Sequence, residues 1–326
     1  MANWLVTGGA GYIGAHVVAA LADKGEQAVV IDDLSTGEPG RATGSVFVEG
    51  SILDEDLVRR TLRDHDVLGI IHIAAKKQVG ESVADPQLYY EQNVVGTLRL
   101  LNAAVAEKVP SFVFSSSAAV YGMPDVEIVT EEMAGRPMSP YGTSKLIGEW
   151  SSRDVAVATG LRVVSLRYFN VAGAARPELG DPGVFNLIPL AFQAIDAGQQ
   201  PRIFGADYPT RDGTCVRDYV HVADIAEAHV AALRDLAEGG GESGSFRVFN
   251  VGRGEGSSVR EVLDLVAEVT GHDLDPTVAD RRPGDPARYV ANVDRIRDEL
   301  GWSASYDLQQ MVSSAWEAWQ HRRSSR

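Results

Sequence analysis

The segment Gly8-Gly9-Ala10-Gly11-Tyr12-Ile13-Gly14 constrains the fold more than any other part of the chain. It follows a short apolar run and precedes a long amphipathic stretch, so it predicts a turn between a first strand and a first helix. Glycines let the backbone approach a ligand closely, and a helix N-terminus offers unpaired amides and a positive dipole. The segment therefore predicts a pyrophosphate site, with a purely structural glycine turn as the alternative.

Strand-like and helix-like stretches alternate up to about residue 170. The strand-like runs are 5–7, 28–31, 69–73, 112–114 and 162–166, and the helix-like stretches are 12–24, 86–107 and 140–159. This rhythm is typical of a parallel sheet covered on both faces. We expect an α/β fold with a doubly wound parallel sheet of the Rossmann type.

Beyond residue 170 the pattern loosens into loops rich in Gly, Pro and Asp, with helices expected near 185–197, 222–236, 258–270 and 307–320. Such a lobe commonly closes over a substrate. We expect residues 1–170 to form a nucleotide-binding domain and residues 171–326 a smaller C-terminal lobe that binds substrate. A return of the chain to the first domain around residues 214–235 stays open.

The formal net charge of −15 disfavours nucleic acid and anionic membranes as partners, because their phosphates would be repelled. Cys215 is the single cysteine, which excludes an internal disulfide and a cysteine metal cluster. The N-terminal residues do not have the pattern of a signal peptide, and no apolar run reaches the length of a membrane helix. We expect a cytoplasmic protein without a metal site.

Asp32 lies at the predicted end of the second strand and refines the expected ligand. A carboxylate there can accept hydrogen bonds from both ribose hydroxyls of NAD, but it would repel the extra phosphate of NADP. The neighbouring Asp33 adds to this repulsion. The sequence therefore predicts NAD as the cofactor.

Ser117, Tyr141 and Lys145 are the candidate catalytic residues. Ser117 ends a serine run after a strand, at the sheet edge where α/β folds bind ligands. Ser139-Pro140 is typical of a helix start, which places Tyr141 and Lys145 one turn apart on one face. A phenol acts as a base at neutral pH only when cations stabilise the phenolate, and Lys145 and a nicotinamide can supply that charge. The alternative is an unrelated surface pair.

Together these features resemble the extended short-chain dehydrogenase/reductase family and, within it, the UDP-glucose 4-epimerases. The matching phrases cover residues 6–14, 79–82, 93–97, 114–122, 166–170 and 217–221, and the similarity extends over essentially the whole chain. The resemblance implies an isomerase that interconverts UDP-glucose and UDP-galactose by reversible NAD-dependent inversion at C4, through a 4-keto intermediate. It also implies a homodimer formed through the stretches 88–106 and 141–158.

The same resemblance assigns binding residues. For NAD it implies Gly8, Gly11, Tyr12, Ile13, Gly14, Asp32, Asp33, Ser51, Ile52, Ile73, Ala74, Ala75, Lys77, Asn93, Tyr141, Lys145 and Phe169. For the nucleotide sugar it implies Ser117, Asn170, Asn186, Leu187, Phe204, Arg217, Arg282, Asp285 and Tyr289. Arginines suit a diphosphate because the guanidinium offers two parallel donors.

Two positions depart from the family or bear on specificity. Ser51 stands where relatives commonly have an aspartate near the adenine amino group, and a serine can still accept that hydrogen bond. Tyr289 stands at a position where, in the family, the size of the residue is linked to acceptance of sugars with an N-acetyl group. A bulky tyrosine there favours UDP-glucose and UDP-galactose over their N-acetyl derivatives.

Three alternatives to this reaction remain. An epimerase could act on UDP-N-acetylglucosamine or a TDP-sugar instead. A 4,6-dehydratase needs an aspartate and a glutamate directly after the residue matching Ser117, where this chain has Ala118 and Ala119. A regulator could bind NAD without catalysis, although it would have no need for a phenolate.

Overall fold

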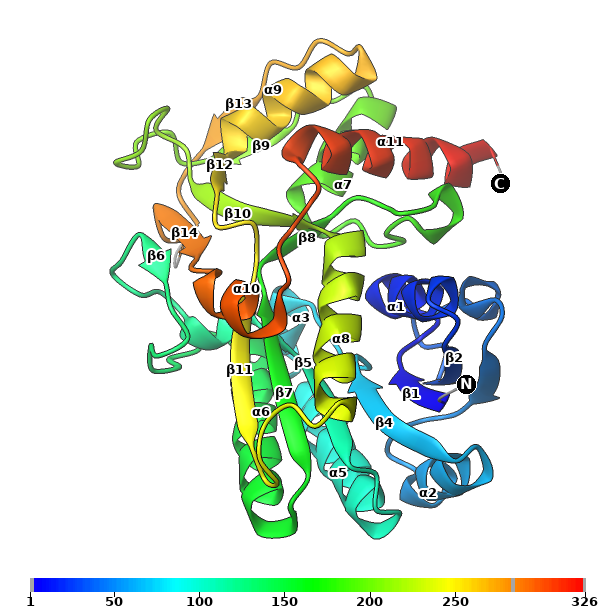
Figure 1. Ribbon diagram of the computed structural model, residues 1–326. Coiled ribbons are helices and arrows are strands. Elements are labelled where there is room, and N and C mark those ends of the chain that lie inside the picture. Colours follow the sequence, from blue (N-terminus) through cyan, green and yellow to red (C-terminus); the bar gives the residue numbers. More distant parts are fainter. Residues whose placement is uncertain (1–2, 283–284, 325–326) are drawn as a thin grey trace.

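The computed structural model describes residues 3–282 and 285–324. Its larger layer is a seven-stranded sheet in the order β11-β7-β5-β4-β1-β2-β3 (Figure 1), and every neighbouring pair is parallel. The strands are β1 (Asn3–Thr7), β2 (Gln27–Asp32), β3 (Val46–Glu49), β4 (Val67–His72), β5 (Ser111–Ser117), β7 (Arg162–Tyr168) and β11 (Phe246–Val251). The predicted parallel sheet is confirmed, whereas β3 and β11 were not foreseen.

Helices cover both faces of this sheet because its strands are apolar on both sides. Along β1, Trp4 and Val6 belong to one apolar cluster and Leu5 to another, as the alternation of side chains in a strand requires. The first cluster includes residues of α1 (Tyr12–Asp23) and α8 (Val222–Ala237), and the second includes residues of α2 (Glu55–Asp64), α5 (Gly96–Ala106) and α6 (Pro140–Thr159). The doubly wound arrangement is confirmed.

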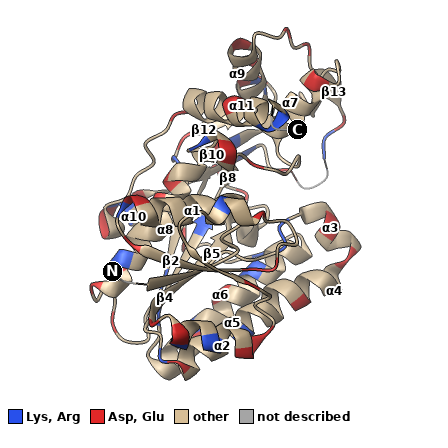
Figure 2. Ribbon diagram, turned by 90° about the vertical axis from the view of Figure 1, so that its right-hand side faces the viewer, with Lys and Arg blue, Asp and Glu red and all other residues tan. Residues whose placement is uncertain are grey.

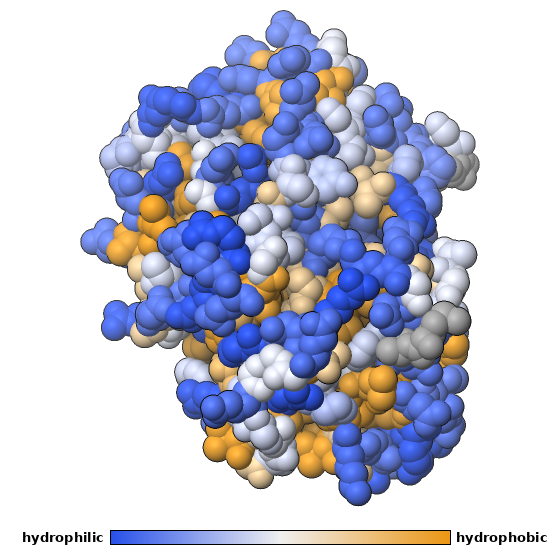
Figure 3. Space-filling model, viewed as in Figure 1, coloured by the Kyte–Doolittle hydropathy of each residue, from blue (hydrophilic) through white to orange (hydrophobic). Residues whose placement is uncertain are grey.

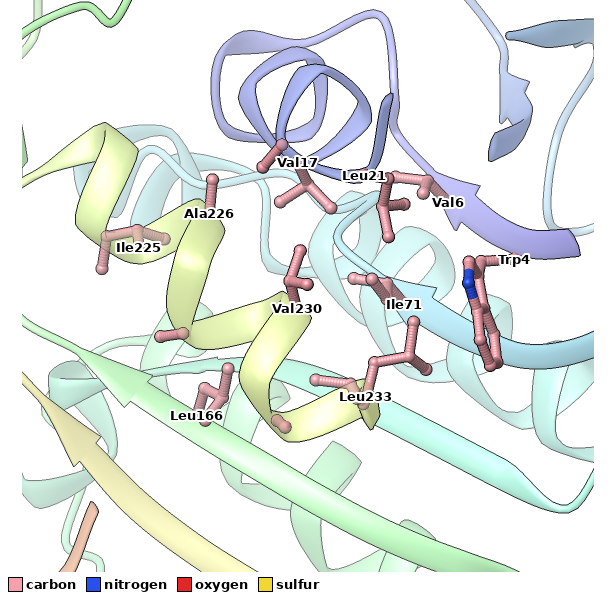
Figure 4. Close-up of a cluster of buried hydrophobic side chains, with 14 of the residues drawn as sticks. Trp4, Val6, Val17, Leu21, Ile71, Leu166, Ile225, Ala226, Val230 and Leu233 are labelled. Carbon is pink, nitrogen blue, oxygen red and sulfur yellow. The ribbon is translucent and has the colours of Figure 1, made fainter. Parts of the chain in front are cut away.

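Helix α8 lies on the sheet although it comes long after residue 170. Val230 and Leu233 of α8 lie in one cluster with Leu21 of α1 and Ile71 of β4 (Figure 4). Strand β11, which follows α8, pairs with β7 at the sheet edge. Two segments from the second half of the chain therefore complete the larger layer, and a domain boundary at residue 170 stays a prediction.

The predicted helix over 86–107 is one continuous helical stretch with a wider turn inside it. It consists of α4 (Pro86–Tyr89), the π-helix η2 (Tyr90–Val95) and α5. A π-turn is rare and is found most often at functional sites. Here it includes the predicted binding residue Asn93.

The predicted helix over 140–159 agrees with α6. Ser139 caps it, accepting a hydrogen bond from the amide of Gly142 at 3.2 Å, and Pro140 occupies the first turn. Gly160 ends the helix in the left-handed conformation at φ 85°. The remaining short helices are α3 (Val79–Ala84) and the 3₁₀ turns η1 (Pro39–Ala42), η3 (Ala118–Tyr121) and η4 (Pro177–Leu179).

A smaller lobe lies above the carboxyl edge of the sheet in Figure 1. Its sheet has the order β12-β10-β14-β6, with β8 paired to β10. The elements are β6 (Ile128–Val129), β8 (Asn170–Ala172), β9 (Arg202–Phe204), β10 (Val216–His221), β12 (Gly256–Ser258), β13 (Thr277–Ala279), β14 (Arg288–Ala291), α7 (Leu187–Asp196), α9 (Val259–Thr270) and α11 (Leu308–Ser324). Helix α10 (Asp294–Leu300) packs on the larger layer, where its Ile296 belongs to the same apolar cluster as α1 and α8. A separate apolar cluster of α7, α9 and α11 forms the core of this lobe.

Acidic and basic residues are interspersed over both layers (Figure 2), and on the face drawn in Figure 3 hydrophobic residues form separate patches in a largely hydrophilic surface. Within residues 3–282 and 285–324, none of the helices combines the length and apolar character needed to cross a membrane. The same residues contain no group of three or more His, Cys, Asp or Glu side chains placed to hold a metal ion.

Candidate functional site

A cavity of about 400 Å³ lies at the carboxyl ends of the central strands. The strand order reverses between β1 and β4, and open α/β sheets bind ligands at such a point. The predicted residues on its wall are Gly8, Gly11, Tyr12, Ile13, Gly14, Asp32, Asp33, Ser51, Ile52, Ile73, Ala74, Ala75, Lys77, Tyr141 and Lys145. Most of the residues predicted to bind the cofactor thus lie around one cavity. That each of them contacts the cofactor stays a prediction.

The glycine turn forms the floor of this cavity. Gly8 has φ +72°, and a Cβ added there would lie 2.8 Å from the amide nitrogen of Ala74. A Cβ on Gly14 would lie 2.0 Å from the carbonyl oxygen of Gly8, which no real contact allows. The turn is compatible only with glycine at these two positions, and it leaves the N-terminus of α1 open to a ligand. This cradle fits the pyrophosphate of NAD.

Asp32 ends β2 at the far side of the cavity, as predicted. Its two carboxylate oxygens accept hydrogen bonds from the amides of Ala10 and Leu34, both at 2.9 Å. Burial raises the pKa of Asp32, and the two amide bonds lower it. An ionised carboxylate has about four acceptor sites, so two remain for the hydroxyls of a ribose.

Tyr141 lies in the first turn of α6, where the cavity meets the end of β5. Its ring is buried and packs edge-on against Tyr89, with the ring centroids 6.4 Å apart. Burial raises the pKa of Tyr141, and a hydrogen bond with the Ser117 side chain lowers it. The structure thus places the Ser117 hydroxyl close enough to Tyr141 to influence the pKa of its phenol.

Lys145 follows one turn later on the same face of α6. Its Nζ donates a hydrogen bond to the carbonyl oxygen of Ser115 at 2.8 Å and lies 5.2 Å from the centre of the Phe114 ring. Burial lowers the pKa of Lys145 to about 8, and the carboxylate of Glu149 raises it. A positive charge is therefore held in the apolar wall beneath Tyr141.

Asn93 does not line the cavity, although it was predicted to contact the pyrophosphate side. It is buried behind the wall, where its carbonyl oxygen accepts from the amide of Lys76 at 2.8 Å. Its amide group donates to the carbonyl oxygen of Lys76 and to Ser144 Oγ, both at 3.0 Å. The structure places Asn93 as a clamp on the loop after β4, one step removed from the cavity.

The predicted substrate residues fall into two adjoining cavities. One of about 490 Å³ is lined by Asn170, Asn186, Leu187 and Arg282, together with Tyr12 from the first cavity. The other, of about 560 Å³, is lined by Leu187, Phe204, Arg217, Arg282 and Asp285. Because Leu187 and Arg282 belong to both walls, these residues surround one continuous region.

The charged groups of this region are held by contacts of their side chains with neighbouring carboxylate and carbonyl oxygens. Arg217 Nη2 lies 3.3 Å from Asp285 Oδ1, and its Nη1 donates to the carbonyl oxygen of Pro286 at 2.8 Å. The guanidinium carbon of Arg282 lies 3.8 Å from the centre of the Phe204 ring. Two cations beside an aromatic ring can hold a diphosphate and a planar base.

Phe169, Ser117 and Tyr289 form a third group, outside the walls of these cavities. The rings of Phe169 and Tyr289 are 5.3 Å apart, and the Tyr289 hydroxyl donates to the carbonyl oxygen of Ala118 at 2.5 Å. The Ser117 hydroxyl accepts from the amide of Ala119 at 3.2 Å. The group lies around the start of η3, next to Tyr141.

Sequence reasoning missed one wall of the cofactor cavity. Asp181, Pro182, Gly183 and Phe185 of the smaller lobe reach over it, and Ser35, Thr36, Gln92 and Tyr168 also line it. Ser35 and Thr36 could have been found from their position just after Asp32. The loop at 181–185 carries no motif, so only the fold reveals its role.

Comparison with known proteins agrees with this geometry. Residues 4–252 match the Epimerase family, described as the NAD dependent epimerase/dehydratase family. The chain belongs to this family. It is 48% identical over 321 residues to the UDP-glucose 4-epimerase of Azospirillum brasilense, covering 96% of this chain and 91% of the relative.

Solved structures of epimerases share the whole fold. The UDP-glucose 4-epimerase of Brucella ovis in complex with NAD has a TM-score of 0.93 at 42% identity, and the similarity covers 97% of each chain. The UDP-glucose 4-epimerase of Stenotrophomonas maltophila, with bound NAD and formylated UDP-arabinopyranose, has a TM-score of 0.95 at 37% identity over 100% of each chain. The similarity to these epimerases therefore extends over both lobes.

Proposed function

We propose that the protein is an isomerase that interconverts UDP-glucose and UDP-galactose by reversible, NAD-dependent inversion at C4. The observation that carries this proposal is the position of Tyr141. It lies on the wall of the cofactor cavity, and the Ser117 side chain is near enough to lower the pKa of its phenol. The UDP-glucose 4-epimerases of Azospirillum brasilense and Brucella ovis match this chain over nearly their full length.

NAD is the cofactor that the first cavity fits. The glycine cradle leaves room for a pyrophosphate and no side chain, and the Asp32 carboxylate has free acceptor sites at the far side. When bound, NAD supplies a reversible acceptor for the hydride at C4. Because the hydride returns to the same sugar, tight retention of the cofactor is compatible with turnover.

Tyr141 removes and returns the proton of the sugar O4. Forming a phenolate at neutral pH costs on the order of 4 kcal/mol for an ordinary phenol, and burial adds to that cost. The buried ammonium of Lys145, one turn away, offsets part of it. Ser117, which lies near Tyr141, orients O4 in the 4-keto intermediate and in both sugars.

The test of this function is to incubate the purified protein, without added NAD, with UDP-galactose, UDP-N-acetylgalactosamine and TDP-glucose. We expect UDP-galactose to be converted to UDP-glucose and UDP-N-acetylgalactosamine to react much more slowly. Tyr289 is held by Phe169 and by the Ala118 carbonyl oxygen, so it leaves little room for an N-acetyl group. Turnover of UDP-N-acetylgalactosamine at a similar rate would contradict this specificity. If the protein binds NAD but converts no nucleotide sugar, the alternative of a non-catalytic NAD-binding regulator would be favoured.

A 4,6-dehydratase is the enzymatic alternative, and the start of η3 argues against it. Elimination of water needs an acid and a base beside the sugar. The residues after Ser117 are Ala118 and Ala119, and neither carries a proton-transfer group. Formation of a 4-keto-6-deoxy sugar from TDP-glucose would overturn this choice.

We also propose that the protein forms a homodimer through the stretches 88–106 and 141–158. These stretches carry exposed apolar side chains on the same face of the sheet, including Leu98 and Trp150, which is 50% exposed. Val157, two helical turns after Trp150 on α6, is 75% exposed. Sedimentation should show a dimer at micromolar concentration, and Trp150→Glu should shift it towards the monomer. A monomeric wild type would remove this proposal.

The proposed location is the cytoplasm. Cys215 is buried and free, which fits a reducing compartment, and the UDP-sugars named for the relatives are the expected substrates. Activity recovered only in a membrane or extracellular fraction of the source cells would contradict this location.

A further inference from the structure

Three consecutive serines at the end of β5 hold three residues spaced one turn apart on α6. The Ser117 side chain lies near Tyr141 and lowers the pKa of its phenol, and the Ser115 carbonyl oxygen accepts from Lys145 Nζ at 2.8 Å. The Ser116 hydroxyl donates to Glu149 Oε1 at 2.6 Å. The first two contacts belong to the proposed reaction, whereas the third has no role in it so far.

Glu149 is a buried carboxylate with an unusually complete set of partners. It is 2% exposed, and its Oε1 accepts from Ser116, from Ser165 at 3.2 Å and from Arg167 Nε at 2.8 Å. Its Oε2 accepts from Arg167 Nη2 at 2.5 Å. A buried ion pair often adds little stability over an apolar pair of the same size. Its presence one turn behind Lys145 therefore calls for a reason other than packing.

We propose that Glu149 is a positioning residue for catalysis, acting in two ways. Through Ser116 it fixes the end of β5 that holds Lys145 and Tyr141, and its carboxylate keeps a negative charge behind the Lys145 ammonium. The proposal rests on the proposed function, in which a charged Lys145 stabilises the Tyr141 phenolate.

The other groups around Lys145 cannot replace this charge at neutral pH. His72 of β4 and His229 of α8 face the ammonium, and burial lowers their pKa values to about 3 and about 4. Tyr141 on the same helix and Tyr168 of β7, which faces Tyr141, are phenols whose pKa values burial raises. Within the described part of the chain, Glu149 is thus the negatively charged group that raises the pKa of Lys145.

Arg167 holds the carboxylate in place from the opposite side. It comes from β7, and its guanidinium carbon lies 4.7 Å from the centre of the Tyr121 ring. Removal of the Glu149 charge would leave Arg167 as an additional buried cation. Both effects lower the pKa of Lys145, so the direction of the expected shift is unambiguous.

The first experiment measures the titration of Lys145 in the protein as purified. The chain has five lysines, so ¹³C-labelled lysine gives few NMR signals, and Lys145→Arg assigns one of them. Glu149→Gln should lower the pKa of Lys145 by about one unit, because a nearby opposite charge that favours the ammonium is lost. Glu149→Asp keeps the negative charge, so the pKa of Lys145 in this variant should stay close to its wild-type value.

Ser152→Ala is the matched control on α6, because the Ser152 hydroxyl is buried without a hydrogen-bond partner. It should leave the titration of Lys145 unchanged. An unchanged pKa in folded Glu149→Gln would overturn the role of the charge. This measurement does not depend on turnover, so it remains decisive if the protein epimerises no nucleotide sugar and the proposed function fails.

The second experiment tests the contact of Ser116 and uses a variant that keeps the ion pair. Ser116→Ala should lower kcat about tenfold and leave KM nearly unchanged, because the sheet edge under Tyr141 and Lys145 loses one anchor. Ser111→Ala is the control on the same strand, since its buried hydroxyl also has no partner. Equal kcat values for the two variants would overturn the positioning role, even if Glu149→Gln does not fold.

Discussion

The two halves of the ligand-binding region are built in different ways. The cofactor half consists of strand ends and one tight turn, and its residues are fixed by the sheet and by backbone hydrogen bonds such as those to Asp32. The substrate half consists of loops and short strands, and its charged residues are held through their side chains, as Arg217 is by Asp285 and by the carbonyl oxygens of Val216 and Pro286. The first half is rigid because its backbone is paired, whereas the second depends on each side-chain contact.

This difference explains why one half could be predicted more completely than the other. A turn between a strand and a helix needs particular residues at fixed spacing, so it leaves a readable pattern. A loop that reaches a site from a distant part of the chain needs only the correct length and direction. We expect mutations in the cofactor half to abolish binding, and those in the substrate half to weaken it.

Tyr141 lies between the two halves, and its loss should have the largest effect. Tyr141→Phe removes the proton carrier but keeps the ring, so kcat should fall by about 10³-fold while NAD stays bound. The measurement is the rate of UDP-galactose conversion together with the NAD content of the purified protein. Tyr90→Phe, at a partly exposed position, should leave the rate unchanged. Epimerisation by Tyr141→Phe at the wild-type rate would disprove its role.

Gly14→Ala should have the next largest effect, on the cofactor half alone. The new Cβ would lie 2.0 Å from the Gly8 carbonyl oxygen, so the turn must open. Overpacking costs about 1–3 kcal/mol, and at its upper end NAD affinity falls about 100-fold. Calorimetric titration of NAD into cofactor-free protein measures this loss. Gly40→Ala is the control, because its Cβ would meet no atom within 4 Å. Equal affinity in both variants would contradict a rigid cradle.

Acid should destabilise the joint between the two halves. His16 of α1 accepts a hydrogen bond from the amide of Ala175 at 3.0 Å, and burial lowers its pKa from 6.5 to about 4. A depressed histidine pKa gives stability that is present above pH 6.5 and is lost as the pH falls towards 4. His16 should therefore contribute a loss of about 2 kcal/mol between pH 7 and pH 5.

Urea unfolding of wild type and His16→Gln at both pH values isolates this contribution. The variant cannot take up the proton, so it should lose about 2 kcal/mol less than the wild type. Asp218, whose pKa burial raises to about 6, acts in the opposite direction, but it is present in both proteins and cancels in the difference. Equal losses would show that the pKa of His16 is the same in the folded and the unfolded protein.

Arg217→Lys should have the smallest effect, confined to the substrate half. Lysine keeps the charge but loses the forked geometry, so the KM for the UDP-sugar should rise about tenfold with little change in kcat. The NAD content should stay at the wild-type level, because Arg217 lies outside the cofactor cavity. Arg253→Lys, which lies in an ion pair with Glu255, is the control. A loss of NAD in Arg217→Lys would show that the two halves are coupled.

Most of the fold could be predicted from the sequence because its periodicity is local. The helix over 140–159 was found from Ser139, Pro140 and its apolar spacing, and the structure gives the same bounds. Strand β11 was missed because Phe246–Val251 follows eighty residues with another pattern, and its pairing with β7 is a long-range contact. The wall formed by residues 181–185 was missed for the same reason.

Asn93 shows how packing can place a residue behind the cavity that its motif suggests, and its contact with NAD stays a prediction. Its place in the motif was visible, but the π-turn and the pairing with Lys76 and Ser144 put it behind the cavity wall. The serine run gives the opposite case. Only Ser117 was chosen from it, and the tertiary structure gave Ser115 and Ser116 partners on α6 as well.

The sequence by itself determined the strand-turn-helix at Gly8–Gly14, the acid at the end of β2 and the spacing of Tyr141 and Lys145. These features are set by backbone conformation within a few residues, so their chemistry can be read locally. Only the tertiary structure decided which loops close the site, and that Ser116 of β5 and Arg167 of β7 hold the buried carboxylate of Glu149. Those relations join residues far apart in the chain, and they arise only when the sheet and its helices pack together.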